Sequence, residues 1–355
     1  MRLLTCLLLL TAMTGAPPAH ETISELEVPG PLQRLLETQK WDQTPSGFRI
    51  ITLSQLADGC AGQAQLHPAR RAEARRCAAG ALKLAWRTKP GAAVATVGDA
   101  IWLTHLNLIY GAADRLGDCP DPGLHRAITQ RLVSMSLADR HAHAPSYSAV
   151  KARWPADQAA TLASLVRFDS AHGTSLAHAP IAAWKKVVAK TEGASTGHKT
   201  GLPRSEVVGV TAGSALPRGC ANAFLARYGA EVDRELSAAW WASFRDDWVV
   251  HLGPLIGFRE WPPGVERPGD SDSGPIILGI GTAASALSIA AARANGDEAI
   301  AQHLELSAAQ VKMLGVAGGV PNLLLADAIS FEGHWQQPAT PRRLLGPAGE
   351  PADQR

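Results

Sequence analysis

The sequence lacks the features that mark several classes of protein. After residue 19 no stretch reaches the roughly 18 uninterrupted apolar residues of a membrane span. The net charge is +2 and no run of Lys and Arg is dense, which argues against nucleic acid as a partner. No CxxC or Cys/His spacing resembles a zinc site, so we expect no metal. Alternating β-branched runs are almost absent, which argues against a sheet-rich fold.

The N-terminus is the one strongly apolar segment. Residues 1–19 read MRLLTCLLLLTAMTGAPPA, with one positive charge, an apolar run and then small residues. This order is typical of a secretory signal peptide and is too short for a spanning helix. We therefore expect an exported protein, periplasmic or secreted, with no stable membrane insertion after signal removal. Its folded domain is predicted at 20–335, followed by a Pro- and Gly-rich tail at 336–355.

The cysteines that follow the predicted signal fit an oxidising compartment. They are Cys60, Cys77, Cys119 and Cys220. Such a set suggests one or two disulfides. Cys60 with Cys77 closes the shortest loop, and this is the pairing we favour.

Helical periodicity dominates the rest of the chain, where Ala, Leu and Arg carry most segments. The pattern predicts an all-α fold. We expect helices at 31–40, 68–86, 99–116, 122–138, 157–171, 177–191, 219–230, 234–250, 275–295, 298–314 and 319–330.

The connections between these helices alternate in length. Gly117, Gly173 and Gly296 each suit a left-handed helix end. A polar residue suited to starting the next helix follows each of them: Asp118, Thr174 and Asp297. The remaining connections are long, at 139–156, 192–218 and 251–274. Tight turns alternating with long loops predict a ring or bundle of antiparallel hairpins, with every long loop at one end. Long ordered loops tend to carry function, so we expect the site there.

The first long loop delivers Tyr147 and Trp154 to the start of a helix that contains Asp157. The Asp157 side chain has two interpretations. It could cap the helix, because an Asp oxygen accepts the free N–H groups at a helix start. Alternatively it is an acid of the site. In the second loop, Arg218 could either reach a central cavity or lie at the surface.

The third long loop is the most unusual part of the sequence. Aromatic residues mixed with acids and arginines suit a binding wall. Asp270 and Asp272 precede a predicted helix with Pro275 in its first turn, where the helix dipole favours a charged carboxylate. They are therefore either caps or carboxylates that act as base or nucleophile. The other candidates in this loop are Arg259, Glu260 and Trp261.

His105 lies inside the strongly apolar helix predicted at 99–116. It is either a core histidine with its hydrogen bonds satisfied or a proton shuttle, since an ordinary imidazole titrates near neutral pH.

Three segments together resemble the bacterial linalool dehydratase/isomerase family: THLNLIYGAADRLGD, FDSAHGTS and DSGP…AAARANGD, over roughly residues 95–315. The resemblance implies an α/α toroid around a hydrophobic pocket. It also implies an exported enzyme that dehydrates or isomerises a terpene alcohol without a cofactor. His105 corresponds to the family's inner-helix histidine. The family's cysteine pair falls at Ser148 and Asp157, so cysteine chemistry is not carried over.

Together these observations predict an acid–base enzyme of the lyase/isomerase type acting on a small alcohol or similar molecule. Asp157 or Asp272 would be the base, and His105 the proton shuttle. The expected substrate-binding residues are Tyr147, Trp154, Arg259, Glu260, Trp261 and Asp270. One alternative is a glycan-active hydrolase or lyase, because α/α toroids also host such enzymes. The other is a secreted protein that binds a ligand without changing it. An oligomer is compatible with each of these three functions.

Overall fold

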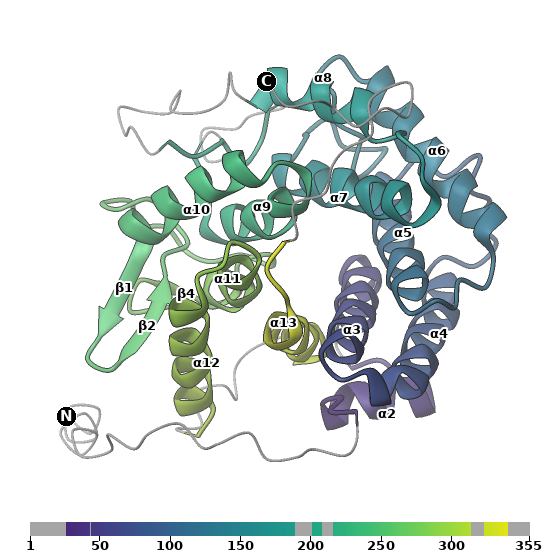
Figure 1. Ribbon diagram of the computed structural model, residues 1–355. Coiled ribbons are helices and arrows are strands. Elements are labelled where there is room, and N and C mark those ends of the chain that lie inside the picture. The colour runs from purple at the N-terminus through teal and green to yellow at the C-terminus, as the bar shows by residue number, and fades with distance from the viewer. Residues whose placement is uncertain (1–25, 43, 189–200, 208–215, 314–322, 340–355) are drawn as a thin grey trace, which may run out of the picture.

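The computed structural model describes residues 26–42, 44–188, 201–207, 216–313 and 323–339. The predicted signal peptide and most of the predicted tail lie outside these ranges. Helices form most of the described chain, which confirms the all-α prediction (Figure 1). None of the described helices is both long and apolar enough to cross a bilayer.

Six of the described helices contact one another in a closed cycle (Figure 1). Each contacts the next along the chain, and the last returns to the first. In order they are α3 (Ser46–Leu66), α5 (Ala100–Arg115), α7 (Pro155–His172), α9 (Gly219–Val232), α11 (Thr282–Ala294) and α13 (Leu323–Trp335). We call these the inner helices.

The other helices pack outside this cycle. For example, α4 contacts α3 and α5, α6 contacts α5 and α7, and α10 contacts α9. The described helices therefore form an inner cycle and an outer layer. The outer helices are α2 (Gly30–Thr38), α4 (Arg71–Thr88), α6 (Pro122–Ala138), α8 (His178–Val188), α10 (Arg234–Trp248) and α12 (Glu298–Met313), and a short 3-10 turn, Pro68–Arg70, precedes α4.

The tight turns join the end of an inner helix to the next outer one. Gly117, Gly173 and Gly296 have φ angles of 68°, 63° and 80°, so the predicted left-handed ends are confirmed. The predicted starting residue Asp118 is wrong. Asp121 caps α6 instead, accepting the N–H of Leu124 at 2.8 Å, because Pro122 occupies the first helical position.

The sequence reading missed helix α3 altogether. Most of its residues are buried on every side, so it has no amphipathic stripe to recognise. Its glycines permit close packing against α13. A Cβ on Gly59 would lie 2.5 Å from the Phe331 ring, and one on Gly62 would lie 2.5 Å from the carbonyl oxygen of Trp335. The missed helix is therefore the one that closes the cycle.

Two short antiparallel hairpins were also missed. Strands β1 (Val249–Leu252) and β2 (Leu255–Phe258) follow α10, and β3 (Ile276–Ile277) pairs with β4 (Ile280–Gly281). The helix predicted from residue 275 therefore begins only at Thr282. Leu278 and Gly279 have φ angles of 52° and 81°, which form a hairpin turn and exclude a helix.

The Cys60–Cys77 disulfide is confirmed, and it joins α3 to α4. Among the cysteines in the described part of the chain, Cys119 and Cys220 are both free.

Candidate functional site

A cavity of about 260 Å³ lies where the inner helices begin. Each of these helices contributes to it from its N-terminal half, so their partial positive dipole ends surround the cavity. Much of the wall is apolar. Its apolar side chains include Phe48, Ile51, Ile101, Phe224, Leu287, Leu325 and Ile329.

Residues of all three predicted long loops line the same cavity. The first loop contributes Tyr147 and Trp154, whose rings pack edge to face with centroids 6.2 Å apart. The second contributes Ser205 and Glu206, and the third contributes Asp272. Loops that are distant in sequence therefore surround one small space.

Asp157 stands in the first turn of α7 and lines the cavity. It does not cap the helix, because the capping position is Trp154, which makes no side-chain bond to the helix start. Instead its Oδ2 accepts a hydrogen bond from the Ser146 hydroxyl at 2.5 Å. Burial raises the pKa of Asp157 to about 6, and the charge of Asp272 adds to this rise. This carboxyl group can therefore exchange protons near neutral pH.

Asp272 is exposed on the rim of the cavity. Its pKa is raised by partial burial and by Asp270, while Arg218 opposes the rise. Asp270 has a different role. Its Oδ1 accepts the N–H groups of Asp272 and Ser273, each at 3.0 Å, and so fixes the turn that presents Asp272. Of the two acids, Asp272 is the one that lines the cavity.

Arg218 is the centre of a charged cluster beside the cavity. Its Nε donates to Oε1 of Glu260 at 2.7 Å, and its Nη2 donates to Oδ1 of Asp270 at 2.8 Å. Its guanidinium also lies 5.0 Å from the ring centroid of Trp261. Glu260, Trp261 and Asp270, predicted to bind substrate, do not line the cavity; they hold the arginine that does.

Glu260 also anchors the start of α9. It is fully buried and accepts the backbone N–H of Cys220 at 3.0 Å and its thiol at 3.2 Å. Burial and this carboxylate raise the pKa of Cys220 well above its usual value, so its thiol is neutral. A cysteine therefore does reach the cavity, but from α9 and not from the first long loop.

His105 does not line the cavity. Its ring is completely buried, and its Nδ1 lies 2.6 Å from the Ser54 hydroxyl. Burial lowers the pKa of His105 to about 3, so the imidazole is neutral at ordinary pH. These observations favour the core-histidine interpretation over the proton shuttle.

Arg259 is also absent from the cavity wall. Its backbone N–H donates to the carbonyl of Trp248 at 3.0 Å, and Ile280 forms a bridge with it. The backbone of Arg259 therefore joins the two hairpins.

The sequence did not identify four wall residues of the cavity: Phe224, Ser205, Glu206 and Cys220. It also left open whether Arg218 reaches the cavity or lies at the surface. The signal that could have found Arg218 and Cys220 is their place at the junction of a long loop and an inner helix. Ser205 and Glu206 lie in a loop of low complexity, where composition marks no individual residue.

No protein-family model matches the chain, and no curated protein matches it.

Proposed function

We propose that the chain is an enzyme that removes water from a small, mainly apolar alcohol, or isomerises it, by acid–base chemistry. The observation that carries the proposal is a pair of carboxyl groups, Asp157 and Asp272, on one largely apolar cavity wall. Their electrostatic coupling and different environments suit a division into acid and base. The resemblance to linalool dehydratase/isomerase supports the same class of reaction.

The proposed reaction uses both carboxyl groups once. Protonated Asp157 donates its proton to the hydroxyl oxygen of the substrate, and the C–O bond breaks to release water. The Asp272 carboxylate takes a proton from the adjacent carbon, and the electrons of that C–H bond form the double bond. Asp157 is then ionised and Asp272 protonated. Exposed Asp272 returns its proton to solvent, and Asp157 regains one.

The remaining polar wall residues would orient the substrate. Partial burial and nearby carboxylates raise the pKa of Tyr147 to about 12, so its phenol keeps its proton and can donate a hydrogen bond. Trp154 supports the Tyr147 ring. Arg218 keeps a positive charge beside Asp272, which favours the ionised form that a base requires.

The apolar wall favours an alcohol over a glycan. A sugar offers several hydroxyl groups that must each find a polar partner when they are buried. The volume of the cavity, about 260 Å³, also lies just below the roughly 300–1,000 Å³ of typical ligand pockets. The glycan-active alternative therefore has less support.

The test is a turnover assay on a panel of tertiary and allylic alcohols, monoterpene alcohols included, with soluble polysaccharides in parallel. We expect an alkene or isomerised alcohol from at least one alcohol, detected by gas chromatography and mass spectrometry. Asp157→Asn and Asp272→Asn should each lower kcat by about 10²–10⁴-fold. The matched control is Asp246→Asn, which changes an exposed acid and should leave turnover unaltered.

Other outcomes of this assay would overturn the proposal. Cleavage of a polysaccharide alone would indicate the glycan-active alternative. An alcohol that binds and is recovered unchanged would indicate a binding protein. Full turnover by both Asn variants would exclude the carboxyl pair from the chemistry.

A further inference from the structure

Asp114, His125 and His172 come together at the end of the helix cycle opposite the cavity. Asp114 is in the last turn of α5, His125 is near the start of α6, and His172 ends α7. Ile101, a wall residue of the cavity, lies at the other end of α5, about 20 Å away along the helix. The cluster is thus separate from the proposed active site.

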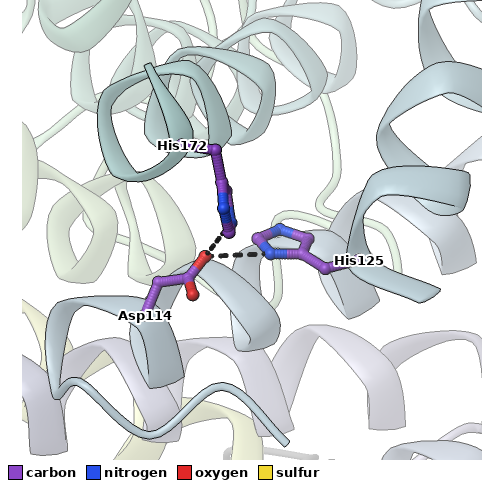
Figure 2. Close-up of side chains that lie close together, drawn as sticks. All are labelled: Asp114, His125 and His172. Atoms are coloured by element: carbon purple, nitrogen blue, oxygen red, sulfur yellow. Dashed lines mark hydrogen bonds and ion pairs between the residues drawn. The ribbon is translucent and has the colours of Figure 1, made fainter. Parts of the chain in front are cut away.

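The potential ligand atoms of the three side chains converge (Figure 2). One such atom from each residue lies within 4.8 Å of the other two. Nδ1 of His125 is 2.9 Å from Oδ2 of Asp114, and Nε2 of His172 is 3.0 Å from the same oxygen. Around a metal with bonds of about 2.0 Å, neighbouring ligand atoms in a tetrahedron lie about 3.3 Å apart. Small movements would therefore admit an ion.

His125 gives the second reason to expect a ligand here. Its side chain is completely buried, yet neither ring nitrogen has a hydrogen-bond partner of acceptable geometry. Nδ1 has the 2.9 Å ion-pair contact with Oδ2 of Asp114, and Nε2 has no hydrogen-bond partner among the described residues. A buried polar nitrogen without a partner is costly, and bonding between the three side chains alone does not satisfy it. A metal ion bound to one nitrogen of this ring would give that nitrogen a partner.

Aromatic neighbours hold the His125 ring in place. Tyr110 stacks on it with centroids 5.3 Å apart, and Phe168 meets it edge-on at 4.8 Å. A ligand ring fixed in this way loses little freedom when a metal binds. The side chain of His172 is 20% exposed, which leaves a path for an ion to enter.

We propose that Asp114, His125 and His172 bind a divalent transition metal, with Zn²⁺ the ion that this ligand set suits. Two imidazoles and one carboxylate are established zinc ligands, and water would complete the tetrahedron. The ion would tie α5, α6 and α7 together at their tight-turn end. Because the ion binds the folded protein, the ion would also stabilise the folded state.

The experiment uses the untagged wild-type protein, freed of metal with a chelator and desalted. Zn²⁺ is titrated by calorimetry, and the melting temperature is measured with and without Zn²⁺. We expect one saturable site and a higher melting temperature with the ion. Asp114→Asn and His172→Ala should each weaken Zn²⁺ binding more than the roughly tenfold that loss of an outer partner costs.

The matched control is His178→Ala, which removes an exposed histidine from α8 and should bind Zn²⁺ as the wild type does. Both test variants should fold, since one is isosteric and the other changes a partly exposed side chain. Circular dichroism without metal checks this. Absence of a saturable site, or equal Zn²⁺ affinity in the control and both test variants, would overturn the proposal.

Discussion

At the scale of single residues, Asp157 shows how a carboxyl group is prepared for proton transfer. Its helix is one of several that direct partial positive charge toward the cavity, which would favour the charged form. Burial and the nearby carboxylate of Asp272 act in the opposite sense and prevail, so its pKa rises to about 6. One hydrogen bond from Ser146 does not offset the loss of water.

The buried environment of Asp157 lowers the stability of the folded protein at neutral pH, and a measurement of unfolding free energy can detect this. The folded protein binds the Asp157 proton more tightly than the unfolded chain, so the stabilisation is full below pH 3.8 and is lost as pH rises through about 6. Asp157→Asn should therefore raise the unfolding free energy by about 1–3 kcal/mol at pH 7.5 and have little effect at pH 3.5. Chemical denaturation at the two pH values measures this. An equal effect at both, or destabilisation at pH 7.5, would contradict the assigned pKa.

Asp157 and Asp272 could be predicted as candidates from their positions in the chain. Asp157 lies where a long loop meets an inner helix, and Asp272 lies at the end of a long loop that leads to another inner helix. The grouping of Arg218, Glu260 and Asp270 could not, because their contacts join residues 42 and 52 positions apart. The composition of the third long loop identified it as charged. It did not show that Glu260 and Asp270 form ion pairs with Arg218. The contact of His105 with Ser54 could not be predicted, because Ser54 belongs to a helix that periodicity did not detect.

At the scale of elements, the packing of α3 against α13 closes the cycle. Gly59 and Gly62 allow the two helices to approach so closely that the backbone and ring of α13 occupy the space of a side chain. Intrinsic propensity disfavours glycine in a helix, which is one reason this helix was not recognised. The packing between the first and last inner helices explains the glycines, and no local pattern could reveal it.

Gly59→Ala tests this contact. The new methyl group would lie 2.5 Å from Cδ1 of Phe331 and 3.3 Å from Cα of Glu332, so we expect a loss of about 1–3 kcal/mol in unfolding free energy. Gly47→Ala in the same helix is the control. Its nearest neighbour is the Tyr147 hydroxyl at 3.6 Å, and alanine should be neutral or stabilise by up to about 1 kcal/mol. Equal effects of the two substitutions would show that α3 and α13 are not packed this closely.

At the scale of the whole molecule, buried ion pairs occupy the end of the cycle away from the cavity. Arg167 forms paired hydrogen bonds with Asp58 and with Glu231, at 2.7–2.9 Å. Arg227 continues the network from Glu231 to Glu332. These residues belong to α3, α7, α9 and α13, so one network connects most of the inner helices. The sequence did not indicate it, since each partner comes from a different helix.

Loss of the central arginine should destabilise the fold. Arg167→Met leaves Asp58 and Glu231 buried with fewer positive charges, and we expect a cost of about 3–5 kcal/mol. Arg245→Met, which removes an arginine with a 39% exposed side chain, should cost about 1 kcal/mol or less. Equilibrium denaturation compares them. A loss below about 1 kcal/mol for Arg167→Met would mean that the network does not hold the inner helices together.

The measurement that tests the central claim most directly is the pH dependence of kcat/KM for an alcohol that the protein converts. If protonated Asp157 is the acid, kcat/KM should fall about tenfold per pH unit once pH exceeds about 6. Asp157→Asn should then show little turnover at any pH. A rate that stays constant from pH 5 to 8, or an Asp157→Asn variant that keeps the same profile, would contradict the account.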